Sequence, residues 1–285
     1  MSAVSEDYFD PIARLVETMR DSVPDLDPSH VMVVGAWCRD LFHAALGHDF
    51  EPRATRDIDL ALALSGWEAY ELLARAFPQA GGTGVRFKIA GLVTDVLPFG
   101  ELEDPRGRIV PPTRGEAISV WGFAEIFSGS SQILIGPALA IRCPTVPGYA
   151  AMKLAAWLDR SEWGETKDAN DLALIGYWYS ESKYVEAQLY DTAEGQQVLV
   201  AEDVDRSRAA ARLLGRDVAA SLGPERMAEL MARWPGDIDM LFRNLTVAGR
   251  PQWLASADHR REFVDALARG LTDPLLSNNQ DSAKS

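Results

Sequence analysis

Two kinds of hydrophobic pattern alternate along the first part of the chain. The segment IARLVETM (residues 12–19) spaces its apolar residues as one face of a helix does. The segment HVMVVGAW (residues 30–37) is a short β-branched run that ends at Gly35, and WCRDLFHAAL (residues 37–46) returns to helical spacing until Gly47. The pattern therefore predicts a helix, a strand, a glycine turn and a second helix.

The next segments predict more of a sheet. DIDLALAL (residues 57–64) alternates strictly, so its leucines and Ile58 share one face, while Asp57 and Asp59 share the other. WEAYELLARAF (residues 67–77) has helical spacing, and VRFKIAGLVTDVLPFG (residues 85–100) reads as two strands joined near Ala90 and Gly91.

The character of the chain changes in its second half. Short strand candidates, ISVW, QILI and ALAIRC, lie in a segment rich in proline and glycine, whereas nearly everything after Pro147 has helical spacing. We expect an α+β fold, with a mixed-sheet core in residues 1–146 and a helical domain in residues 147–275. Residues 276–285 are polar and are expected to be a disordered tail.

Composition and charge exclude several classes of protein for this chain. The formal net charge of the 285 residues is −14, and the basic residues are scattered, so no strong nucleic-acid footprint is visible. Cys38 and Cys143 form no metal-ligand spacing and no disulfide framework. No apolar run has membrane-spanning length, and the acidic amino terminus is unlike a signal peptide. We therefore expect a cytoplasmic protein without a membrane partner.

Asp57 and Asp59 are the first candidates for residues of a functional site. Because they are two residues apart on a predicted strand, both carboxylates leave the same face and repel each other unless a cation lies between them. Hard oxygen ligands suit Mg²⁺, with Mn²⁺ as a second option, and water and substrate phosphates complete such sites. Asp95 completes the set if its strand lies beside the first, and the trio then suits two metal ions and a nucleoside triphosphate.

The predicted turn at Gly35 supplies a candidate phosphate site. Amides of Gly35, Ala36 and Trp37 can face an anion at a helix start, and Arg39 in the first helical turn can add a charged fork. Each of these sequence features can also have a purely structural explanation. A D-x-D pair is common by chance, and Arg39 can simply pair with Asp40. The order of the pieces along the chain is more specific than any one of them.

These residues resemble a known family. GAWCRD, TRDIDLAL and TDVLPF are similar to the core of DNA polymerase β-type nucleotidyltransferases. MKLAAWLDR and KDANDL further resemble the AbiEii-type nucleotidyltransferases, which include toxins of type IV toxin–antitoxin systems and mycobacterial toxins that modify transfer RNA. The matching segments span residues 31–174.

The resemblance implies a small mixed sheet flanked by helices and a helical domain that closes the nucleotide site. It implies that Lys153 reaches the triphosphate, and that the K-D-x-x-D-L element supplies Lys167 with Asp168 or Asp171. Both acids remain candidates. Each of these residues can also have a purely structural role. Lys153 would then be a solvated helix residue, Asp168 a helix cap, and Asp171 the partner of Lys167 in a weak ion pair.

Two features depart from that pattern or extend it. Ala36 stands where many members have Ser or Gly, so it offers an amide but no hydroxyl. The long loop before Asp57 brings His48, Arg53 and Arg56 towards the expected mouth of the site as contacts for the triphosphate or acceptor. Trp157 and Tyr177 could stack on a base, but buried packing is the favoured reading.

Three functions compete. The first is a toxin-like, metal-dependent transfer of a nucleoside monophosphate from an NTP to a hydroxyl of tRNA or protein, with release of pyrophosphate and with a possible cognate antitoxin. The second is nucleotidyl transfer to a small molecule of the aminoglycoside or lincosamide kind, which the acidic net charge favours. The third is a non-catalytic nucleotide-binding module. The K-D-x-x-D-L segment favours the first.

Overall fold

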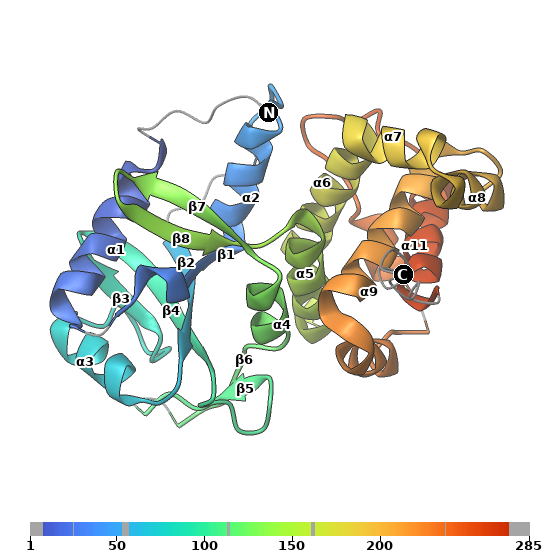
Figure 1. Cartoon of the computed structure of the whole chain (residues 1–285). Coiled ribbons are helices and arrows are strands. Elements are labelled where there is room, and N and C mark those ends of the chain that lie inside the picture. The colour runs from blue at the N-terminus through green and yellow to red at the C-terminus, as the bar shows by residue number, and fades with distance from the viewer. Residues whose placement is uncertain are drawn as a thin grey trace, which may run out of the picture. The chain divides into compact units, whose positions relative to one another are not determined.

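The computed structural model describes residues 8–24, 26–52, 57–112, 115–160, 163–236 and 238–273. The chain forms two compact units, Met1–Ala156 and Trp157–Ser285 (Figure 1). The division between the units falls within the helix Val146–Arg160. It lies ten residues beyond the domain boundary that the sequence placed after residue 146. The predicted tail, residues 276–285, lies outside the described residues.

The first unit is built on a six-stranded sheet with the order β3-β4-β2-β1-β8-β7. Pairing is parallel between β2 and β4 and between β1 and β8, and antiparallel elsewhere in the sheet. The strands are β1 (Val31–Val34), β2 (Asp57–Leu64), β3 (Arg86–Ile89), β4 (Leu92–Gly100), β7 (Ser131–Gly136) and β8 (Leu139–Cys143). A separate two-stranded sheet consists of β5 (Arg108–Ile109) and β6 (Ile118–Ser119). The predicted mixed sheet is thus confirmed.

A two-residue turn makes the hairpin of β3 and β4. Ala90 and Gly91 both have positive φ, at 49° and 86°, which is the backbone that matches the twist of two tightly connected strands. Counting outward from this turn pairs Ile89 with Leu92 and finally Arg86 with Asp95. The turn therefore fixes which side chains face each other across the hairpin.

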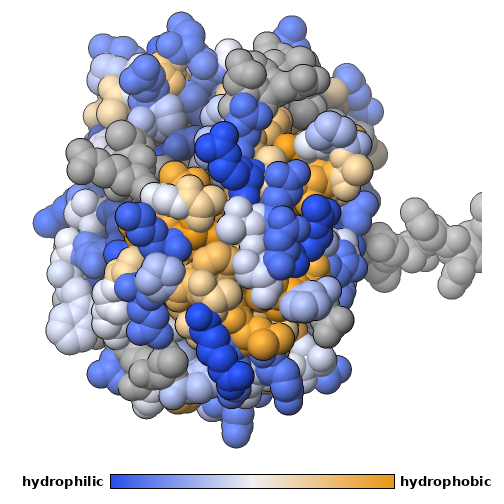
Figure 2. Space-filling model, turned by 90° about the vertical axis from the view of Figure 1, so that its left-hand side faces the viewer, coloured by the Kyte–Doolittle hydropathy of each residue, from blue (hydrophilic) through white to orange (hydrophobic). Residues whose placement is uncertain are grey.

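The first unit also contains helices, several of which pack against the sheet. They are α1 (Asp10–Ser22), the 3-10 turn η2 (Pro28–His30), α2 (Gly35–Ala45), α3 (Glu68–Ala76), α4 (Phe123–Ser128) and α5 (Val146–Arg160). Helix α1 buries Ile12, Leu15, Val16 and Met19, and it contacts both edge strands, β3 and β7, so it runs across one face of the sheet. On the side where α1 and α3 lie, hydrophilic residues surround and interrupt the exposed apolar surface (Figure 2), as on most solvent-facing surfaces.

The described part of the second unit is helical. Its elements are α6 (Lys167–Glu181), α7 (Lys183–Asp191), α8 (Ala193–Ala201), α9 (Arg206–Ala232), α10 (Asp239–Arg243) and α11 (Ala257–Thr272), together with the end of α5. Helix α9 is interrupted at Gly223, which has a φ of 75° and precedes Pro224. The predicted α+β class with a helical second part is confirmed. Among the described residues, no helix is both long enough and apolar enough to cross a bilayer.

A buried carboxylate joins three helices of the second unit. Glu202 follows α8 and is fully buried. Arg269 of α11 holds both of its oxygens, at 3.0 and 2.6 Å, and Arg212 of α9 lies 3.2 Å from Oε1. Arg208, also on α9, approaches Oε2 at 3.4 Å. Such a carboxylate is stabilising only while its cationic partners remain.

We predict that Glu202→Gln lowers the free energy of unfolding by about 3 kcal/mol, because it leaves three guanidinium groups around a neutral amide. Urea denaturation measures the loss. Asp203→Asn removes the same charge from an 84% exposed side chain that pairs with Arg208, and it should cost less than about 1 kcal/mol. Equal losses for the two variants would contradict a special role for Glu202.

Candidate active site

One row of residues crosses four strands of the sheet. The register places Val34 of β1 opposite Asp59 of β2, Asp59 opposite Asp95 of β4, and Asp95 opposite Arg86 of β3. Side chains that face one another on neighbouring strands leave the same face of a sheet. Asp95, which the sequence could place only through an assumed pairing, therefore lies directly beside Asp59.

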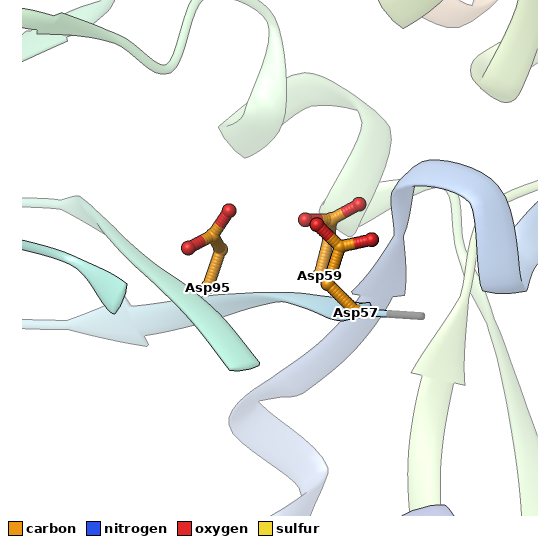
Figure 3. A group of neighbouring side chains, drawn as sticks. All are labelled: Asp57, Asp59 and Asp95. Carbon is orange, nitrogen blue, oxygen red and sulfur yellow. The ribbon is translucent and has the colours of Figure 1, made fainter. Parts of the chain in front are cut away.

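Asp57, Asp59 and Asp95 form the carboxylate cluster of the first unit. One oxygen from each lies within 4.8 Å of the others, and all three side chains are intermediate in exposure. Figure 3 shows Asp57 and Asp59 side by side on β2, with Asp95 on the adjacent strand and its carboxylate on the same side of the sheet. Three hard oxygen donors at this separation fit a divalent cation such as Mg²⁺ or Mn²⁺.

Arg86 belongs to this site, and the sequence reasoning missed it. Its Nε and Nη2 donate to the two oxygens of Asp95 at 2.8 and 2.7 Å, and Nη2 also donates to Asp57 at 3.2 Å. The hydrogen bond with Asp95 is the main cause that raises the pKa of Arg86 above its ordinary value. The sequence did contain a signal for Arg86, namely the two-residue turn at Ala90 and Gly91. Counting back from this turn along the hairpin places Arg86 opposite Asp95.

Asp59 lies in a different environment from its two neighbours. Burial raises its pKa, the negative charges of Asp95 and Asp57 add to the rise, and the resulting value is about 6. The positive charge of Lys153 and a hydrogen bond from the Ala36 amide act in the opposite direction. Lys153, which the family resemblance indicated, thus acts electrostatically on this carboxylate.

Gly35 is the point where α2 begins beside the cluster. It has a φ of 64°, and a Cβ built there would lie 1.8 Å from Oδ2 of Asp59. Only glycine combines this backbone with this approach. The sequence predicted close approach of a ligand to the turn. In the structure the neighbouring Ala36 amide donates to Asp59, so the start of α2 also holds a metal-ligand candidate.

Arg39 differs from the expected open fork. Its side chain is 1% exposed, and its Nε and Nη2 lie 2.7 and 2.6 Å from Oδ1 of Asp40. This geometry is the ion pair with Asp40 that the sequence analysis gave as the alternative to a phosphate contact. Contact with a phosphate would require the guanidinium to leave that buried position.

The lysine and acids of the later motifs fall on two helices. Lys153 lies on the part of α5 that belongs to the first unit, with its Nζ 5.4 Å from the centre of the Tyr149 ring. Lys167 pairs with Glu165 at 2.8 Å in the second unit, in place of the pair with Asp171 considered from the sequence. Asp168 is buried and lies 2.8 Å from Nη2 of Arg160. Asp171 is also buried on α6.

Other candidates from the sequence have simpler placements. Arg53 and Arg56 lie outside the described residues. His48 packs against His43, with ring centroids 5.0 Å apart. Trp157 and Tyr177 are both buried, which agrees with the packing reading.

The mixed sheet, the D-x-D strand beside a third aspartate and the glycine-started helix together define a nucleotidyltransferase-type core. The sequence matches the family described as nucleotidyl transferase AbiEii toxin, type IV toxin–antitoxin system, over residues 44–247. The chain belongs to this family. The match includes all three aspartates and Lys153 but begins after Gly35 and Arg39. No curated protein matches the chain.

We predict that Gly35→Ala weakens Mn²⁺ binding at least about tenfold, the scale found when the support of a metal ligand is disturbed. The new Cβ would overlap the Asp59 carboxylate. Calorimetric titration measures the affinity.

Gly91→Ala is the matched control for Gly35→Ala. Gly91 also has positive φ, but a Cβ there meets nothing within 4 Å. The left-handed backbone should cost each variant about 1–2 kcal/mol of stability, and the overlap with Asp59 should add to the loss in Gly35→Ala. Only Gly35→Ala should lose affinity for the metal. Wild-type Mn²⁺ affinity in Gly35→Ala would contradict the proposed link between Gly35 and Asp59.

The raised pKa of Asp59 predicts that metal binding depends on pH. A proton competes with the cation for this carboxylate, so Mn²⁺ affinity should fall about tenfold for each pH unit below the pKa of about 6. Above that pKa the affinity should level off, because Asp59 is then ionised. Titrations between about pH 5 and pH 8 test this, with circular dichroism to verify the fold. A flat profile across that range would contradict proton competition at Asp59.

Proposed function

We propose that this chain transfers a nucleoside monophosphate from an NTP to an acceptor hydroxyl in a metal-dependent reaction that releases pyrophosphate. The carboxylate cluster of Asp57, Asp59 and Asp95 is the observation that carries the proposal, since three oxygen donors lie within 4.8 Å on one face of the sheet. Membership of the AbiEii family supports the reaction class.

The three aspartates would hold Mg²⁺, with two ions expected. Divalent cations supply charge stabilisation to the entering and leaving oxygens of an in-line displacement at phosphorus. Asp95 would help to hold the metal ions or would accept the proton of the attacking hydroxyl. Asp59 needs to be ionised to contribute, and its pKa of about 6 allows this at neutral pH.

The triphosphate is assigned to the positive groups beside the cluster. Lys153 enters both through the family resemblance and through its charge acting on Asp59. The start of α2 lies at a positive helix end, and Gly35 and Ala36 are proposed to bind phosphate there if the Ala36 amide leaves Asp59. Arg56 and Lys167 remain proposed contacts from the sequence, as does Arg39 if it leaves Asp40.

The acceptor in the proposal is a tRNA or a protein, as in a toxin-like enzyme with a cognate antitoxin. Lys167 with Asp168 or Asp171 supports this assignment through the K-D-x-x-D-L resemblance. The net charge of −14 favours a second candidate, a cationic small molecule, because an acidic surface attracts it and repels RNA. Incubation with each labelled NTP plus Mg²⁺, total RNA, cell protein or an aminoglycoside distinguishes the candidates by which fraction gains label.

We predict that Asp57→Asn and Asp59→Asn each reduce this labelling about a thousandfold or more, since the metal supplies several kcal/mol of transition-state stabilisation. Both substitutions keep side-chain size while removing a charge from the cluster. The assay uses whichever acceptor fraction wild-type protein labels, and thermal unfolding verifies that the variants fold.

Asp258→Asn on α11 is the control for those variants, because it removes one exposed carboxylate in the second unit. It should label the acceptor as wild type does. Labelling at wild-type rate by the Asp57 and Asp59 variants would overturn the proposed reaction.

A further inference from the structure

The carboxylate cluster already contains a cation of the chain's own. The guanidinium of Arg86 engages both oxygens of Asp95 and Oδ2 of Asp57. Its side chain is 34% exposed, and those of Asp57 and Asp95 are 39% and 19% exposed. A two-pronged pair of this kind is stronger and more directional than a contact with a lysine.

Two of the three candidate metal ligands, Asp57 and Asp95, are engaged by Arg86. Asp95 has two oxygens, and the fork of Arg86 takes both. Arg86 donates to Asp95 and Asp57, whereas Asp59 accepts a hydrogen bond from the Ala36 amide. A cation bound by all three aspartates would therefore have to share Asp57 and Asp95 with a positive guanidinium, and two positive charges so close repel each other.

We propose that Arg86 is a built-in counter-cation of the cluster, which holds Asp57 and Asp95 in position and which a divalent cation must displace in order to bind. This inference rests on the proposed metal site and adds a positioning residue to it. Arg86 stabilises the fold by neutralising the repulsion among the aspartates, and by the same interaction it weakens the affinity for metal. The two effects are linked, since whatever stabilises the form without metal opposes metal binding.

The sign of the effect on metal affinity separates this role from simple structural support. If Arg86 only orients Asp95 for the metal, then removing it disorders a ligand and weakens binding. If Arg86 competes with the metal, then removing it strengthens binding while the protein without metal becomes less stable. The same variant therefore answers both questions.

The test compares wild-type protein, Arg86→Gln and Arg86→Lys after chelation with EDTA, using Mn²⁺ alone as the probe. Arg86→Gln should bind Mn²⁺ about tenfold more tightly than wild type, a change equal to about 1.4 kcal/mol. Arg86→Lys keeps the charge but loses the fork, so its affinity should lie between the two. Without metal, Arg86→Gln should melt below wild type, and added Mn²⁺ should raise its melting temperature by more.

Lys88→Gln is the matched control. Lys88 lies two residues further along β3, on the same face of the sheet, and it is exposed. The substitution Lys88→Gln removes one positive charge near the cluster, but it leaves the hydrogen bonds from Arg86 to Asp95 and Asp57 in place. Its Mn²⁺ affinity should change less than about threefold, because exposed charges are screened.

Unchanged or weaker Mn²⁺ binding by folded Arg86→Gln would overturn the counter-cation role and leave the metal site intact. If Arg86→Gln fails to fold, the comparison of Arg86→Lys with wild type decides by the same sign. If neither wild type nor Arg86→Gln binds Mn²⁺ in a manner that Asp59→Asn abolishes, the proposed metal-dependent function fails as well. The two failures are therefore distinguishable.

Discussion

Repulsion among three carboxylates is the constraint around which the first unit is organised. The parallel pairing of β2 with β4 places Asp59 directly beside Asp95, and the pleat adds Asp57 on the same face. Such a cluster is costly without compensation. Compensation comes from Arg86 at one end of the row and from the Ala36 amide and Lys153 around Asp59. The positive groups around the site are therefore part of its stability as well as of its chemistry.

Charge balance gives the two units opposite kinds of ionic cluster. Around Glu202, three arginines surround one buried carboxylate, so the group is satisfied by the chain and joins helices. Arg208 also pairs with Asp203, and Arg212 also pairs with Asp273. In the first unit, one arginine contacts two of three aspartates, and burial together with the neighbouring negative charges raises the pKa of Asp59. The excess of negative charge favours binding of a cation. The ratio of acids to bases, more than the presence of ion pairs, distinguishes a structural cluster from a candidate site.

Much of this site could be predicted from local sequence. Strict alternation placed Asp57 and Asp59 on one face of a strand, and the glycine turn placed the start of a helix nearby. Even Arg86 was within reach, because a two-residue turn fixes the hairpin register by counting. Arg39 shows the opposite case. Its position in the first turn of α2 was compatible with a phosphate contact or with an ion pair to Asp40, and only the structure shows the buried pair.

The sequence by itself determined the order of elements from α1 to β4, the mixed α+β class and the identity of the three aspartates, because periodicity and turn residues are local properties. Only the tertiary structure decided that β4 lies parallel to β2, that Gly35 approaches Asp59 too closely for any side chain, and that Arg86 also reaches Asp57. Strand neighbours, close backbone approaches and ion pairs between distant residues arise from packing of the whole unit. No local pattern encodes them, since each depends on segments that are remote along the chain.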